Sequence, residues 1–427
     1  MGLTRGSLTF TRFFVSGSPP RDFRNRFVQA ARLRRFEPLA AEDEAQEASG
    51  WCALERPFDL ELDHEKIYHD HYLLLGFRVD RWRIPGAALR AHLADEERRV
   101  LEKTGRAKLS RAQKAELKQR VVARLRRKVL PSTLAIDVCW DLDAGTVLFF
   151  SHSPRLALDF AALFEKTFGL RLHEDSPYFA AGRAPLSTTE QRALARVQPV
   201  SFSSGRKRLG GRQRSQGAER PKPSEPQPPT ENVEPSGDLV DRIETTRFLG
   251  SELLLWLWMK HELLDAELEI PEIGPCEAWL GTELTLASPL DPGERVALRG
   301  AAPTSGAEAK AALAAQKFPV RARLGLRSGE DEFDLVLKAD TLQIGSASIP
   351  ARIQDGDDAF LERMALVERL TAMLDGIYAT FLRVRLDPRW SSAWEPALVA
   401  WLEDAPPTGT ALAELSGSLR IGRRRAR

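Results

Sequence analysis

Alternating apolar and polar residues predict strands in the first half of the chain, and apolar residues at helical spacing predict helices between them. Strands are expected at 3–15, 51–54, 66–79, 133–142 and 145–151. Helices are expected at 22–35, 86–104, 110–129 and 154–168. Pro85 favours a helix start at residue 86, Gly105 breaks that helix, and Pro131 stops the next one. The region 86–130 is therefore a pair of helices.

The second half mixes helices and strands without a regular βαβ alternation. Helices are expected at 246–266, 306–316 and 358–383, and a strand pair at 320–327 and 332–337. This order favours an α+β fold with antiparallel sheets. We predict four regions, which are a domain at 1–175, an Arg/Pro/Ser-rich and disordered linker at 176–245, a domain at 246–405, and a basic tail at 406–427.

Composition favours a globular intracellular protein. The start lacks the apolar core of a secretory signal, and the three cysteines form no C-x-x-C pair. The most apolar run, 253–259, is far shorter than the roughly 20 residues that span a bilayer. Trp256 and Trp258 lie on different sides of that helix, so we expect it to be buried in a core or at a subunit interface.

Charge is distributed unevenly along the chain. The formal net charge is only +2, but residues 95–128 hold thirteen Lys or Arg against five Asp or Glu, a local balance of +8. Residues 206–222 hold seven against one, or +6, which leaves −12 for the remainder. Such sorting predicts a basic surface on an acidic body, so the average charge says little about the partners of the protein.

The helix at 110–129 carries the sharpest charge pattern. Leu117, Val121, Leu125 and Val129 recur every four residues and predict one apolar stripe. We expect the basic side chains to lie opposite this stripe, where a polyanion can rest against them. They form two rows, one with Arg111, Lys114 and Lys118, and one with Arg120, Arg124, Arg127 and Lys128. Rows of cations can neutralise several duplex phosphates at once, and the released counterions drive binding without reading the base sequence.

Two other interpretations of this helix stay open, an ordinary solvated face and a docking site for an acidic protein. Solvated faces usually mix charges of both signs at i, i+4, whereas Glu116 is the only acidic residue within the helix at 110–129. Two further basic segments are either auxiliary DNA tethers or soluble chain. These are Arg206–Arg208 with Arg212 and Arg214, and Arg423–Arg425 with Arg427.

A histidine cluster offers the one hint of metal or acid–base chemistry. His64, His69 and His71 lie near acidic residues, and His69 and His71 would share one face of a strand. Two metal ligands one helical turn apart, as in zinc hydrolases, do not occur there, and no phosphate loop, nucleophile elbow or dinucleotide fingerprint is present. We therefore expect a non-enzyme without cofactors, with a hydrolase at residues 64–71 as the third hypothesis.

Several stretches resemble the recombination-associated RdgC family in their order and spacing. The stretch WRIPGAALRAHLADEERRVLEKTGRAKLSRAQKAELKQRVVARLRRKVLP is similar to the family's Pro-opened helix pair. A Trp-containing hairpin over 140–150 and a helix at 153–170 follow it, as in the family. The segment 307–325, with EDEFDLVLKADTLQIGSASIP and the long helix after it, resembles the family's second half.

The resemblance implies a curved, horseshoe-like subunit that forms a homodimeric ring around double-stranded DNA. It implies cytoplasmic, nucleoid-associated binding with little sequence preference that restrains RecA by occupying its substrate. By position, Lys317 corresponds to a basic residue lining the ring, and Arg299 lies at the edge of a second basic segment. The sequence departs from the family at Ser132–Leu134, where an arginine and an aromatic residue are usual, and at Gly300–Ala302, which replaces a Lys-Lys-Gln stretch.

Overall fold

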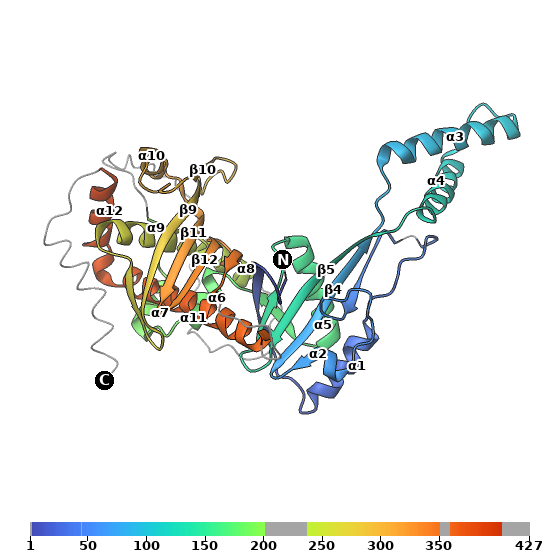
Figure 1. Cartoon of the computed structure of the whole chain (residues 1–427). Helices are drawn as coiled ribbons and strands as arrows, with labels where there is room; N and C mark the ends of the chain where they lie inside the picture. The colour runs from blue at the N-terminus through green and yellow to red at the C-terminus, as the bar shows by residue number, and fades with distance from the viewer. Residues whose placement is uncertain (1, 44, 201–236, 351–358, 404–427) are drawn as a thin grey trace, which may run out of the picture. The chain divides into compact units, whose positions relative to one another are not determined.

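The computed structural model describes residues 2–43, 45–200, 237–350 and 359–403, and its fold is α+β (Figure 1). The chain divides into two compact units. Unit 1 contains residues 3–11 and the chain from Glu174 onward, and unit 2 contains residues 12–173. The long strands pair antiparallel, which confirms the prediction of an α+β fold with antiparallel sheets.

The sheet of unit 2 has its longest strands at its centre. β4 (Tyr72–Arg81) and β5 (Ser132–Asp141) pair over ten residues, from Tyr72 opposite Asp141 to Arg81 opposite Ser132. The other strands are β2 (Glu47–Cys52), β3 (Tyr68–His69) and β6 (Thr146–Phe149). Two more strands, β1 (Leu8–Ser16) and β7 (Arg171–Glu174), belong to unit 2 only with residues 12–16 and 171–173. Its helices are α1 (Phe23–Leu33), α2 (His64–Ile67), α3 (Gly86–Thr104), α4 (Arg111–Arg126) and α5 (Pro154–Phe168).

Aromatic side chains form the core of unit 2. Phe160 of α5 stacks on Phe149 of β6, with ring centroids 4.4 Å apart, and Phe27 of α1 stacks on Trp140 of β5 at 5.3 Å. All four rings are almost fully buried. Burying rings of this size dominates the energetics of a small core, so these contacts hold α1 and α5 on the sheet.

Unit 1 is built on a second run of antiparallel strands, in the order β10, β9, β11, β12, β13. Their bounds are β9 (Gly274–Ala287), β10 (Arg295–Arg299), β11 (Phe318–Ser328), β12 (Asp331–Lys338) and β13 (Gln343–Ser348). The short strand β8 (Glu267–Ile270) pairs with β9. Its helices are α6 (Pro177–Arg183), α7 (Thr188–Leu194), α8 (Gly237–Thr246), α9 (Phe248–Leu263), α10 (Ala307–Ala314), α11 (Ala359–Arg385), the 3-10 turn η1 (Pro388–Trp390) and α12 (Trp394–Leu402).

Helix α9 lies in the core of unit 1, which decides between the two predicted positions, a core and a subunit interface. Trp256 and Trp258 are each 1% exposed, and α9 packs on β9 and β11. No helix among the described residues is long and apolar enough to cross a membrane.

Two predictions about local structure were wrong. The predicted linker 176–245 contains helices at both ends, α6 and α7 before residue 200 and α8 after residue 236, while 201–236 lies outside the described residues. The predicted strand at 66–79 begins with the helix α2 and the short strand β3. Side-chain caps explain these starts, because Ser176, Ser187 and Asp63 each accept a hydrogen bond from a backbone N–H of the first helical turn.

Candidate nucleic-acid interface

Helices α3 and α4 form a hairpin at one end of the central strands of unit 2. The chain enters α3 after Arg81, the last residue of β4, and returns from α4 to Ser132, the first residue of β5. Figure 1 shows the helix pair beyond this end of the two strands, apart from α1 and α5. Gly105, with φ of 62°, ends α3, and Ser110 opens α4 with a capping box to Gln113.

The contact between the two helices is narrow. Leu117 and Val121 are the buried apolar residues of α4, while none of the described residues of α3 is buried. Leu93 and Val100 of α3 are half-buried. Because so little of either helix is covered, most side chains of the hairpin face solvent.

Four of the seven predicted cations of the α4 region form no ion pair in the part of the chain that the structure describes. They make no ion pair within 4.0 Å and their side chains are exposed. These residues are Arg111, Lys118, Arg120 and Lys128. They are the side chains most readily available to phosphates.

The other three cations of the region are paired with carboxylates. Lys114 Nζ lies 2.7 Å from Glu97 Oε1, and Arg124 Nη1 lies 3.0 Å from Glu96 Oε2, so both pairs join α4 to α3. Arg127 pairs with Glu42 at 2.5 Å. The hydrogen bond from Arg124 is the main cause that lowers the pKa of Glu96 from its usual value. Paired cations are thus interspersed with unpaired ones along this segment.

The expectation that the cations lie opposite the apolar stripe was wrong. At about 100° per residue, Lys114 and Arg120 stand three residues before and after Leu117, about 60° to either side of it. The side of α4 turned away from the seam instead carries small and neutral side chains, including the exposed Ala112, Ala115 and Gln119. The basic rows therefore border the seam, which is why α3 carboxylates reach them.

Three exposed cations in the turn of the hairpin were not among the predicted site residues. Lys103 is at the end of α3, and Arg106 and Lys108 are in the turn before α4. None of the three has an ion pair among the described residues. They belong to the same basic segment, but helical periodicity could not select them because two of them are outside both helices. Arg126 has a different role, since it is buried, lies over the Trp82 ring and donates to the Asp43 carbonyl.

The remaining predicted cations are in unit 1 or outside the description. Arg299 is exposed at the end of β10, and Lys317 is 3.7 Å from Glu294 and 21% exposed. The basic segments 206–214 and 423–427 lie outside the described residues.

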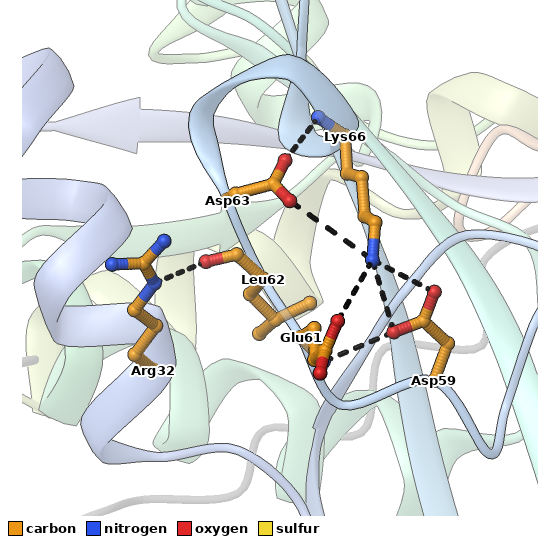
Figure 2. A network of polar contacts seen from close by, with 6 residues as sticks. All are labelled: Arg32, Asp59, Glu61, Leu62, Asp63 and Lys66. Carbon is orange, nitrogen blue, oxygen red and sulfur yellow. Dashed lines mark hydrogen bonds and ion pairs between the residues drawn. The ribbon is translucent and has the colours of Figure 1, made fainter.

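One acidic residue of the predicted histidine cluster, Asp63, faces a lysine together with two carboxylates that precede it in the chain. Figure 2 shows the Lys66 ammonium between the carboxylates of Asp59, Glu61 and Asp63, at 3.0, 3.9 and 4.0 Å. In the same view Arg32 of α1 donates to the Leu62 carbonyl, which ties this loop to the helix. These contacts give Asp59, Glu61 and Asp63 a structural role.

The predicted arrangement of His69 and His71 was also wrong. His69 is opposite Tyr72 in a tight hairpin whose turn is Asp70-His71, so the two histidines do not follow each other along one strand. Asp70 has a φ of 56°, which allows the reversal. His71 Nδ1 lies 2.8 Å from Asp70 Oδ2.

No family model matches the chain, and no curated protein resembles it closely enough to count as a match.

Proposed function

We propose that this chain binds double-stranded DNA without sequence preference, and that the α3–α4 hairpin of unit 2 carries the contact. The observation that supports this most directly is the set of exposed, unpaired cations on that hairpin, in a segment with a local charge of +8. A projecting pair of helices can enter a groove or follow a phosphate backbone with little rearrangement. Binding of this kind depends on counterion release rather than on base contacts.

Fluorescence anisotropy with a labelled random duplex, over a series of salt concentrations, tests the proposal. The logarithm of the affinity should fall linearly with the logarithm of the salt concentration, with a slope of about −0.9 per phosphate neutralised. The variant Arg111→Ala/Lys118→Ala/Arg120→Ala should make the slope shallower by about 2.7, since it removes three free cations. Binding that ignores salt, or a triple variant with the wild-type slope, would refute the proposal.

A matched control changes the same charge elsewhere on the molecule. Arg5, Arg21 and Arg192 are exposed, lie outside the hairpin, and have no ion pair among the described residues. The variant Arg5→Ala/Arg21→Ala/Arg192→Ala alters net charge as much as the hairpin variant does. Its slope should stay near that of the wild type if the hairpin is the contact.

The resemblance to the RdgC family extends the proposal to a homodimer. Two copies would close a ring around the duplex, with Arg299 and Lys317 lining or bordering it, and would restrain RecA by occupying the DNA. This implies a cytoplasmic, nucleoid-associated protein. Sedimentation at micromolar concentration should give a dimer, and a monomer there would remove the ring from the proposal.

A second candidate function is docking of an acidic protein on the hairpin. It is favoured by the apolar side chains of α3 that remain half-exposed, which are Leu89, Leu93, Val100 and Leu101. A protein partner would cover these residues, whereas DNA would need only the cations. Replacing Leu89 by Ser, which leaves Leu93 and Val100 at the helix contact in place, should leave duplex affinity unchanged if DNA is the ligand.

A further inference from the structure

Two carboxylates of α3 occupy cations that the proposed DNA contact would otherwise use. Glu97 is bonded to Lys114 across the helix pair, and Glu96 is bonded to Arg124. Glu96 also lies 3.5 Å from Arg99 on its own helix. The two acidic side chains are only 25% and 33% exposed, because they stand at the seam between the helices.

The position of these two residues differs from that of the other glutamates of the hairpin. Glu102 and Glu116 are exposed, and neither makes an ion pair with a residue that the structure describes. They contribute negative charge to the surroundings but hold no cation in place. Glu96 and Glu97 contribute negative charge and also hold a cation in place.

We propose that Glu96 and Glu97 limit the affinity of the hairpin for duplex DNA by holding Arg124 and Lys114 away from phosphate. This inference rests on the proposed function and adds a regulatory element to the same site. A cation bonded to a carboxylate must give up that bond before it can neutralise a phosphate, so it releases fewer counterions on binding than a free one. The hairpin then binds DNA more weakly than its charge would allow.

The size of the effect follows from counting phosphate contacts. One additional contact steepens the salt slope by about 0.9, which corresponds to an extra loss of affinity of about 3.5-fold between 50 and 200 mM salt. A change of net charge that frees no cation affects DNA affinity only through the long-range electrostatic field of the protein. That field is screened beyond a Debye length of about 10 Å at 0.1 M ionic strength.

The first experiment compares three substitutions in the full-length chain, Glu97→Gln, Glu96→Gln and Glu116→Gln, with the random duplex as probe. All three remove one negative charge from the same hairpin, and all are close to isosteric. We expect the first two to bind tighter at 50 mM salt and to steepen the slope by about 0.9 each. We expect Glu116→Gln to keep the wild-type slope.

A double-mutant cycle then connects the effect to the pair itself. Lys114→Ala in the wild-type background should leave the slope unchanged, because Glu97 already occupies that cation. The same change in the Glu97→Gln background should remove the gained contact and return the slope to the wild-type value. Additive effects of the two changes would contradict the inference.

The outcomes separate this inference from the proposed function. If Glu96→Gln and Glu97→Gln bind with the slope of Glu116→Gln, the limiting role is refuted while DNA binding stands. If the wild type itself shows no salt-dependent binding, the proposed function fails. Circular dichroism of each variant reports whether the helices persist, and if one variant loses its helices the other still tests the inference.

Discussion

Breaking the buried ion pair of unit 1 should destabilise that unit strongly. Arg385 Nε of α11 lies 2.6 Å from Glu252 Oε2 of α9, with the side chains 7% and 3% exposed. The second carboxylate oxygen accepts a hydrogen bond from the Val200 N–H at 2.7 Å, and the guanidinium donates to the Gln198 carbonyl at 2.6 Å. The pair therefore holds α9, α11 and residues 198–200 together.

The expected magnitude follows from this burial. Glu252→Gln leaves the Arg385 charge in the core without its counter-charge, and removing one partner of a buried pair costs about 3–5 kcal/mol. Glutamine keeps the shape and one acceptor oxygen, so we expect a value of about 3 kcal/mol. At about 2–4 °C per kcal/mol for a unit of this size, the Tm should fall by roughly 6–12 °C.

Thermal unfolding followed by tryptophan fluorescence measures the effect, since Arg385 lies 4.8 Å above the Trp390 ring. The control is Glu244→Gln, which breaks an ion pair with Arg247 that is about half exposed. Exposed pairs contribute about 0–1 kcal/mol, so the control should change the Tm little. Equal shifts for the buried and the exposed pair would refute the reasoning.

Two further predictions concern a close packing contact and a hairpin turn. Gly250→Ala in α9 should destabilise unit 1 by at least about 1–3 kcal/mol, measured by chemical denaturation, because the new Cβ would lie 1.8 Å from the Ala339 carbonyl oxygen. Gly182→Ala in α6, where nothing lies within 4 Å, should instead stabilise by about 0.5–1 kcal/mol, and the reverse order would contradict the argument. Burial lowers the pKa of His71, but the hydrogen bond to Asp70 and nearby carboxylates outweigh it, so the pKa is raised. The stability that protonated His71 contributes is complete below its unfolded-state pKa and disappears as the pH rises through its folded-state pKa. Asp70→Asn should therefore lower the His71 pKa in an NMR titration, and an unchanged pKa would oppose this assignment.

The sequence predicted the helices that carry strong boundary signals. The helices at 86–104 and 154–168 begin and end at the predicted residues. Each has a proline at or just before its first turn and a glycine in the left-handed region directly after its last residue. The short helices α6 and α7 were missed because seven residues are too few for a periodic pattern to appear.

Which cations are free could not be predicted from the pattern of one helix. The partners of Lys114 and Arg124 are 17 and 28 positions earlier in the chain, and the partner of Arg127 is 85 positions earlier. Counting charges at i, i+3 and i+4 detects only ion pairs between residues of the same helix. Pairing across the seam depends on how α3 and α4 rotate about their axes, and that is fixed by the packing of Leu117 and Val121.

The ion pairs at the seam connect the proposed DNA binding to the folding of the hairpin. With α3 burying none of its described residues, its attachment to α4 depends on a narrow apolar contact and on the pairs formed by Glu96 and Glu97. A phosphate that took Lys114 or Arg124 would remove part of this attachment. The DNA would then compete with α3 for the same cations, so contacts with the free residues Arg111, Lys118 and Arg120 should form first. High salt should weaken both the DNA contact and the packing of α3 on α4, because both depend on the same charges.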